Sequence, residues 1–148
     1  MTIDKTSNWW TGTEAGDLEG YLAQFASDFD LAVDAFRISR CPDCGSLLFQ
    51  VEYLDGRTSV RHVCMGCGRA QYVCDSGGPR WHGACRSFIC PACSSQVANV
   101  GVGFTLNPAK DSVEWLYVGL RCARCGLLGC PADWSVGYSP SMHILDWA

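Results

Sequence analysis

Four CxxC pairs are the residues of this chain whose type and spacing most directly suggest chemistry. They lie at residues 41–44, 64–67, 90–93 and 122–125. A CxxC turn brings two thiolates onto one metal ion, and Zn²⁺ favours four tetrahedral ligands, with thiolate sulfurs at about 2.3 Å. The spacing therefore predicts two structural zinc sites, one held by Cys41, Cys44, Cys64 and Cys67 and the other by Cys90, Cys93, Cys122 and Cys125.

The pairs form two similar blocks, which indicates a duplicated unit. In block one 19 residues separate the two pairs, and in block two 28 residues separate them. Gly45, Gly68 and Gly126 follow three of the pairs, where a positive φ would turn backbone N–H groups toward the sulfurs. Ser94 follows the remaining pair, so we expect that knuckle to differ slightly.

Three further cysteines lie outside the pairs. Cys74 and Cys130 each follow the second pair of a block among apolar neighbours, and a tetrahedral site is complete without them, so we interpret both as core residues. Cys85 is three residues from His82, a spacing able to chelate a metal. A third site built from Cys74, His82 and Cys85 is the alternative to a loop histidine and a half-buried cysteine, which we favour.

Strands must position the pairs, and the hydrophobic pattern predicts them. Residues 47–53 alternate in polarity, Asp55-Gly56 is a hairpin turn signal, and 58–63 return to the second pair. In block two, residues 97–106 and 112–120 flank "NPAKD", and 113–120 are apolar on both faces, which is typical of a doubly buried strand. Exit strands are expected over 69–76 and 127–138.

The two ends of the chain predict further elements. Leu18, Leu22, Phe25 and Phe29 recur at helical spacing, so we expect an amphipathic helix near 17–28 with Asp17 as its N-cap. The segment "DLAVDAFRIS" predicts a strand that leads into the first pair, and "DWSVGYSP" a strand ended by Pro140. Ser141 is expected to cap a last turn over 142–147.

These elements predict a small mixed, mainly β fold. It consists of two tandem four-cysteine zinc ribbons packed together with an N-terminal amphipathic helix. The expected boundaries are 1–36 for the leader and helix, 37–81 for ribbon one, and 82–148 for ribbon two with a C-terminal strand and turn.

Composition bounds the compartment and the partners. The 148 residues are 48% hydrophobic, which suits a packed globule. The first ten residues lack the pattern of a signal peptide, and no apolar run approaches the roughly 20 residues that span a bilayer, so we expect a reducing cytoplasm and no membrane association. The net charge of −4 disfavours a general attraction to phosphate backbones.

The knuckles "CPDCG", "CMGCG", "CPAC" and "CARCG" resemble those of the zinc-ribbon class. The wider pattern resembles small bacterial double-ribbon proteins of no settled function, through "FRISRCPDCGS", "YVGLRCARCGLLG" and "ADWSVGYSP". This resemblance covers residues 36–140. It implies a fold and a pair of metal sites, and it implies no reaction and no partner.

Closed four-cysteine sites supply folding energy and no open coordination position, so the leading expectation is a non-enzymatic protein that binds another protein. Its candidate contact surface joins the acidic helix to Trp9, Trp10 and Trp147, unless these residues fold back on the core. One alternative is nucleic-acid binding through Arg57, Arg61 and Arg69 with nearby aromatic residues. A second alternative is a thiol-based redox protein or small enzyme that uses Cys85 with His82, although the sequence shows neither a base within reach nor a cleft. The sequence leaves the oligomeric state open.

Overall fold

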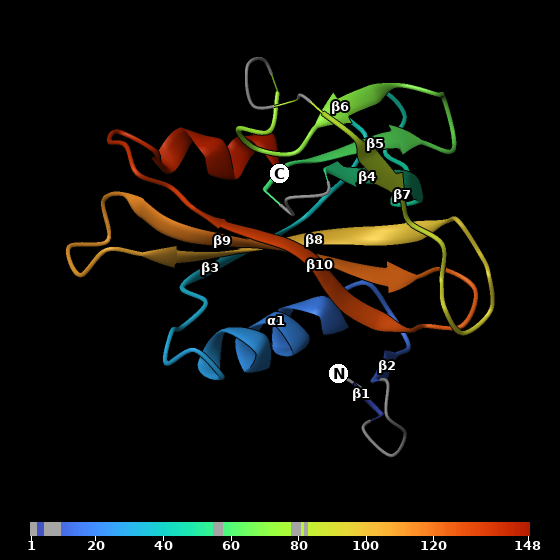
Figure 1. Ribbon diagram of the computed structural model, residues 1–148, viewed down its shortest axis with the longest axis horizontal. Coiled ribbons are helices and arrows are strands. Elements are labelled where there is room, and N and C mark those ends of the chain that lie inside the picture. Colours follow the sequence, from blue (N-terminus) through green and yellow to red (C-terminus); the bar gives the residue numbers. More distant parts are fainter. Residues whose placement is uncertain (1–2, 5–9, 55–57, 78–80, 82) are drawn as a thin grey trace.

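Antiparallel strands make up most of the structure, a computed structural model that describes residues 3–4, 10–54, 58–77, 81 and 83–148 (Figure 1). In chain order the elements are β1 (Ile3–Asp4), β2 (Thr11–Gly12), α1 (Asp17–Ser27), β3 (Ala35–Ile38), β4 (Phe49–Leu54), β5 (Val60–Cys64), β6 (Ala70–Tyr72), β7 (Cys85–Ser87), β8 (Ala98–Leu106), β9 (Val113–Cys122), β10 (Leu128–Ser135) and the 3-10 helix η2 (Met142–Trp147). The prediction of a mainly β fold is confirmed. Within the described ranges, no helix is long and apolar enough to cross a membrane.

Both predicted hairpins form. β4 pairs with β5 and β8 pairs with β9, while β6 and β10 add a third strand to each hairpin. The turn predicted at Asp55-Gly56 lies outside the described residues. The last strand was expected to reach Pro140, but β10 ends at Ser135, opposite Trp115, and only the Val136 N–H continues the pairing, to the Glu114 carbonyl at 2.9 Å.

The strand that leads into each block pairs with the hairpin of the other block. β3, before Cys41, pairs with β8, and β7, before Cys90, pairs with β4. The two hairpins meet at Phe49 and Ala98, which hold the same position relative to Cys41 and Cys90. The two halves are therefore related by an approximate two-fold relation, with one strand exchanged between them. The pairing of β7 was not predicted, because its three residues are all exposed and only the edge of β4 makes them a strand.

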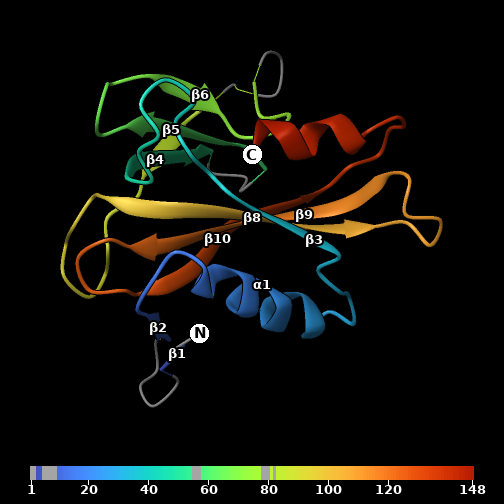
Figure 2. The same cartoon turned by 180° about the vertical axis from the view of Figure 1, so that it is seen from behind.

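The strands β8 and β9 form the middle layer of the molecule. Helix α1 lies on one face of this layer, and β4–β6 with η2 lie on the other (Figures 1 and 2). The side chain of Tyr117 packs with α1, whereas Leu116 and Val118 pack into the core shared with block one. This alternation follows from the two-residue period of a strand and confirms that β9 is buried on both faces.

The amphipathic helix predicted near residues 17–28 is not supported as proposed. The helix runs only from Asp17 to Ser27, and Phe29 beyond it is 63% exposed. It ends there because Asp30 adopts a left-handed backbone with φ of 60° and the Leu31 N–H returns to the Ala26 carbonyl at 3.0 Å. Asp17 is not a cap; its carboxylate accepts hydrogen bonds from the backbone N–H groups of the preceding turn, at 2.8 and 3.3 Å.

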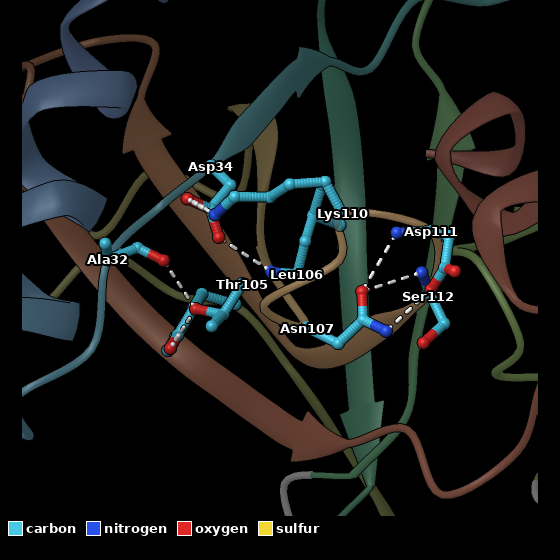
Figure 3. Close-up of polar contacts among 9 residues, drawn as sticks. Ala32, Asp34, Thr105, Leu106, Asn107, Lys110, Asp111 and Ser112 are labelled. Atoms are coloured by element: carbon cyan, nitrogen blue, oxygen red, sulfur yellow. Dashed lines mark hydrogen bonds and ion pairs between the residues drawn. The ribbon is translucent and has the colours of Figure 1, made fainter.

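The β8–β9 turn holds the connection between α1 and β3 (Figure 3). The hydroxyl of Thr105 donates to the Ala32 carbonyl at 2.7 Å, and the Asp34 carboxylate accepts from the Leu106 N–H at 2.8 Å. Lys110 donates to the same carboxylate at 2.8 Å, and this hydrogen bond is the main reason why the pKa of Asp34 is lowered. The chain thus leaves α1 at a fixed place and enters β3 in register with β8.

Candidate metal centres

The first cluster brings together the four cysteines of block one. The Sγ atoms of Cys41, Cys44, Cys64 and Cys67 all lie within 4.8 Å of one another. The Cys41 and Cys67 sulfurs are 3.5 Å apart, and the Cys44 and Cys64 sulfurs are 3.4 Å apart. Four sulfurs about 2.3 Å from a tetrahedral metal would be about 3.8 Å from one another, so the cluster has the size and donor set of a four-thiolate site.

The second cluster repeats this arrangement with Cys90, Cys93, Cys122 and Cys125, again within 4.8 Å of one another. The Cys90–Cys125 and Cys93–Cys122 sulfur distances are both 3.5 Å. The two blocks therefore each gather the four cysteines that the sequence grouped, in a geometry compatible with a bound metal ion.

Each cluster lies where a hairpin begins and ends. Cys64 and Cys122 are the last residues of β5 and β9, opposite Phe49 and Ala98. These two cysteines are buried, whereas Cys125 is exposed. One side of each cluster thus joins the core and the other side faces solvent.

All four knuckles share one backbone conformation, contrary to the expectation for Ser94. The N–H of Gly45 bonds to the Cys41 carbonyl at 2.8 Å, and the N–H of Ser94 bonds to the Cys90 carbonyl at 2.8 Å. Ser94 has a φ of 66°, close to the 76° of Gly45. The turn geometry imposes the left-handed conformation even on a residue that disfavours it.

Hydrogen bonds divide the charge unevenly within each cluster. Burial works against ionisation of Cys64, but the backbone N–H groups of Cys67 and Gly66 and the thiol of Cys44 outweigh it and lower the pKa of Cys64 to about 6. The N–H of Arg69 favours ionisation of Cys67, but the shared proton with Cys41 and burial raise the pKa of Cys67 to about 12. Cys64 thus takes the negative charge while Cys67 keeps its proton, which a divalent cation would displace on binding.

The second cluster shows the same division. Backbone N–H groups of Cys125 and Arg124 overcome the opposing effect of burial and lower the pKa of Cys122 to about 7. Burial is the largest cause that raises the pKa of Cys125 to about 12. Cys122 and Cys125 therefore repeat the electrostatic roles of Cys64 and Cys67.

The remaining cysteines lie outside both clusters. Cys74 is 5% exposed, as predicted for a core residue, and burial raises the pKa of its thiol. Cys130 is only half-buried, and its thiol donates to the Ala132 carbonyl at 3.4 Å. Cys85 is exposed, with its sulfur 3.8 Å from the Glu52 carboxylate. His82 lies outside the described residues, and in the part of the chain that is described neither Cys74 nor Cys85 belongs to a group of metal-ligating side chains.

His62 is a packing residue. It is 2% exposed, with its ring centroid 4.1 Å from that of Phe49. Burial lowers the pKa of His62 to about 4, so the imidazole is neutral near pH 7.

The structure also places an arginine beside two aromatic rings that contact each other. The Arg61 guanidinium lies 4.7 Å from the centroid of the Trp81 ring and 5.8 Å from that of Tyr72. The same guanidinium donates to Glu52 at 2.7 Å. Trp81 was missed as a partner because it joins this group from a loop, although the cross-strand pairing of Arg61 with Tyr72 follows from the strand register.

Two of the three terminal tryptophans can be placed. Trp10 packs edge-on against Tyr21 at 5.8 Å between centroids, and its carbonyl accepts from the Leu128 N–H at 2.8 Å. Trp147 is 53% exposed, although its carbonyl accepts from the Cys74 N–H at 2.8 Å. Trp9 lies outside the described residues. Trp10 therefore folds back onto the protein, while Trp147 stays half-exposed with its ring against that of His143, at 4.9 Å between centroids.

A metal ion in either cluster would be surrounded by four sulfurs, an arrangement suited to holding the chain together. The second pair of each block would then fix the end of a hairpin, and the first pair would fix the chain just after the exchanged strand. Comparison of the chain with models of protein families, with curated proteins and with solved structures finds no match.

Proposed function

We propose that the chain is a non-enzymatic zinc protein in which two structural Zn²⁺ ions hold a double ribbon that binds another protein. The observation that carries this proposal is the closure of both clusters, since four thiolates leave a tetrahedral Zn²⁺ no position for a substrate or an activated water. Thiol ligands of this kind persist in a reducing compartment, so the cytoplasm is the proposed location.

Zinc fits the clusters better than a hard cation. The donors are all sulfur, and a tetrahedral set of thiolates is typical of Zn²⁺ or of iron. Native mass spectrometry should show the mass of two Zn²⁺ per chain, and elemental analysis should show zinc. One metal per chain, or an iron chromophore, would contradict the assignment.

The cysteine variants separate ligands from packing residues. Because the binding free energy of a structural zinc becomes folding free energy, Cys41→Ser and Cys122→Ser should each lose a metal and unfold or aggregate. Cys74→Ala and Cys130→Ala should keep both metals and lower the free energy of unfolding by about 1–2 kcal/mol through lost packing. Loss of a metal from either alanine variant would show that the interpretation of Cys74 or Cys130 is wrong.

A protein partner is proposed because metal sites without an open position have no place for a substrate, so we infer that the protein acts by binding. Tagged protein purified from the cells of its source should enrich a specific protein, and the enrichment should survive nuclease treatment. Enrichment that nuclease removes would instead favour the second candidate.

The second candidate is the binding of single-stranded nucleic acid. Tyr72 and Trp81 present aromatic rings beside Arg61, a combination on which bases can stack. Arg61 is neutralised by Glu52 and Arg69 by Asp43, so the affinity for phosphate would be weak. Arg57 lies outside the described residues. A salt-dependent change in anisotropy of a labelled oligonucleotide, lost in Trp81→Ala, would support this candidate over the first.

A further inference from the structure

The last strand of the large sheet has a backbone edge that faces away from its partner strand. The sheet runs in the order β10-β9-β8-β4-β5-β6, and among the described residues β6 pairs with β5 alone. Figure 2 shows β6 on the side of β5 away from β8. The Cys64 N–H donates to the Arg69 carbonyl at 2.9 Å. Because hydrogen-bonded and non-hydrogen-bonded pairs alternate along an antiparallel ladder, the N–H of the next residue, Ala70, points away from β5.

In block two the chain itself pairs with the equivalent edge. The Gly12 N–H donates to the Gly126 carbonyl at 2.8 Å, and the Leu128 N–H donates to the Trp10 carbonyl at 2.8 Å. Residues 10–12 thus lie antiparallel to residues 126–128 as one more short strand. Residues 126–128 are all buried.

Block one lacks this additional strand among the described residues. Gly68 and Ala70 hold the positions of Gly126 and Leu128 relative to the cysteine pairs, but residues 68–70 are all exposed. A Cβ added at Gly68 would meet no atom within 4 Å, whereas one added at Gly126 would collide with the Gly12 carbonyl oxygen. In the part of the chain that the structure describes, neither the Gly68 carbonyl nor the Ala70 N–H has a backbone partner. The edge therefore offers one acceptor and one donor at the spacing that residues 10–12 use in block two.

Aromatic rings lie on one face beside this edge. In block two, Trp10 packs against Tyr21 of α1. In block one, Arg61 holds the position of a glycine that faces α1, and its guanidinium lies beside the rings of Tyr72 and Trp81. These two rings are 5.4 Å apart between centroids. A strand bound in block one would therefore direct the side chain at the position of Trp10 toward the face that carries Tyr72 and Trp81.

The charges beside the edge are already paired. Arg61 forms an ion pair with Glu52 at 2.7 Å, and Arg69 forms one with Asp43 at 2.8 Å. Exposed backbone groups and aromatic rings are thus the features with which a ligand can interact. An exposed strand edge is a template for a further strand, and proteins bind extended peptides in this way through main-chain hydrogen bonds.

We propose that the edge of β6 binds an extended segment of the partner protein, antiparallel to residues 68–70, as residues 10–12 pair with 126–128. This inference rests on the proposed protein-binding function and names its surface. One residue of the segment accepts a hydrogen bond from the Ala70 N–H and carries an aromatic side chain that contacts Tyr72 and Trp81. The residue two positions later donates to the Gly68 carbonyl. The main-chain bonds supply affinity and the aromatic contact supplies specificity.

The test of the edge removes its donor. Ala70→Pro lacks the N–H that points away from β5, a position at which an edge strand tolerates proline. Ala70→Ser is the matched control, because it keeps the N–H. In the unchanged chain, hydrogen exchange should show rapid exchange of the Ala70 amide and slow exchange of the Leu128 amide, which is bonded to Trp10.

The probe is a fluorescein-labelled peptide with the sequence of residues 8–13, used as a stand-in for the partner segment. The zinc-loaded full chain should bind it saturably. A second peptide with N-methylglycine in place of Gly12 lacks the N–H that donates to the Gly68 carbonyl and should bind at least tenfold more weakly. Ala70→Pro should weaken binding of the first peptide at least tenfold, and Ala70→Ser should leave it unchanged. In an NMR titration, the amide shifts should move at Ala70 and Tyr72.

Several results would overturn the proposal. These are the absence of saturable binding, equal affinity for the two peptides, equal effects of Ala70→Pro and Ala70→Ser, or shift changes confined to Leu128, where the peptide would replace residues 10–12. Slow exchange of the Ala70 amide would show that the chain itself already covers the edge. Self-association that Ala70→Pro abolishes would show that a second copy fills this place instead.

A comparison of retained proteins separates this proposal from the proposed function. If Ala70→Pro and the unchanged chain retain the same protein from cell extract, the edge proposal fails while the protein-binding function stands. If neither chain retains a protein, the proposed function fails as well.

Discussion

Ser94 offers the most direct test of the knuckle geometry. Its φ of 66° lies in the left-handed region, beside values of 76°, 79° and 82° for the glycines of the other three knuckles. This conformation costs an L-residue roughly 1–2 kcal/mol, while glycine loses roughly 0.4–1 kcal/mol more conformational entropy on folding. The difference leads us to expect that Ser94→Gly raises the free energy of unfolding by about 0.5–1 kcal/mol.

The reverse change at the equivalent position should have the opposite sign. An added Cβ at Gly45 would meet no atom within 4 Å, so Gly45→Ser introduces backbone strain without a clash. We expect it to lower the free energy of unfolding by about 0.5–1 kcal/mol, the same amount with reversed sign. Ser94→Ala is the control, because it removes the hydroxyl and keeps the strained Cβ, and it should resemble the unchanged chain.

Urea unfolding at a buffered zinc concentration measures all three variants. The midpoint should shift while the m-value stays constant, and the melting temperature should move by about 1–4 °C for a chain of this length. A Ser94→Gly variant that is no more stable than Ser94→Ala would refute the reasoning, since the left-handed backbone would then carry no strain.

Three other predictions concern two further glycines and the removal of the metals. In Gly119→Ala the new Cβ would lie 3.1 Å from the side chains of Leu18 and Leu22, so urea unfolding should show that the free energy of unfolding falls by about 1–3 kcal/mol. Gly129→Ala is the control, because its Cβ would meet no atom within 4 Å, and its free energy of unfolding should stay close to that of the unchanged chain. In Gly126→Ala the Cβ would collide with the Gly12 carbonyl oxygen, and the positive φ would add backbone strain. Gly68→Ala introduces the strain alone, so urea unfolding should show a larger loss of stability for Gly126→Ala than for Gly68→Ala. Equal losses would contradict the packing of β2 on this knuckle. Titration with a chelator should remove both metals and the β-structure in one transition, because the exchanged strands tie each site to the other half, and a stable one-zinc form would contradict this.

The cysteine clusters and the hairpins could be predicted because their signals are local. The CxxC spacing groups the ligands without knowledge of the fold, and alternation over 47–53 reports which face of that strand is buried. The doubly buried β9 was found in the same way, from a run of apolar residues long enough to exclude a half-exposed strand.

The exchange of β3 and β7 could not be predicted, because no residue of either strand specifies its partner. β7 has only exposed residues, and it forms a strand because β4 pairs with β5 along one edge and leaves its other edge free for β7. The end of α1 was wrong for a related reason: Phe29 continues the helical spacing, but the backbone leaves the helix to reach β3. Ser94 shows that a residue with a weak local preference follows the turn that the surrounding structure imposes.

At one pair of equivalent positions, one half carries two glycines and the other half carries an ion pair, and this difference explains which half α1 covers. Gly101 and Gly119 face each other across β8 and β9, and Leu18 fills the space above them. Their equivalents in block one are Glu52 and Arg61, which face each other across β4 and β5 and form an ion pair at 2.7 Å. An ion pair loses its hydration if an apolar helix covers it, whereas paired glycines leave backbone and apolar surface that a helix can bury. One half therefore accepts α1, whereas the equivalent face of the other half keeps a partly exposed ion pair.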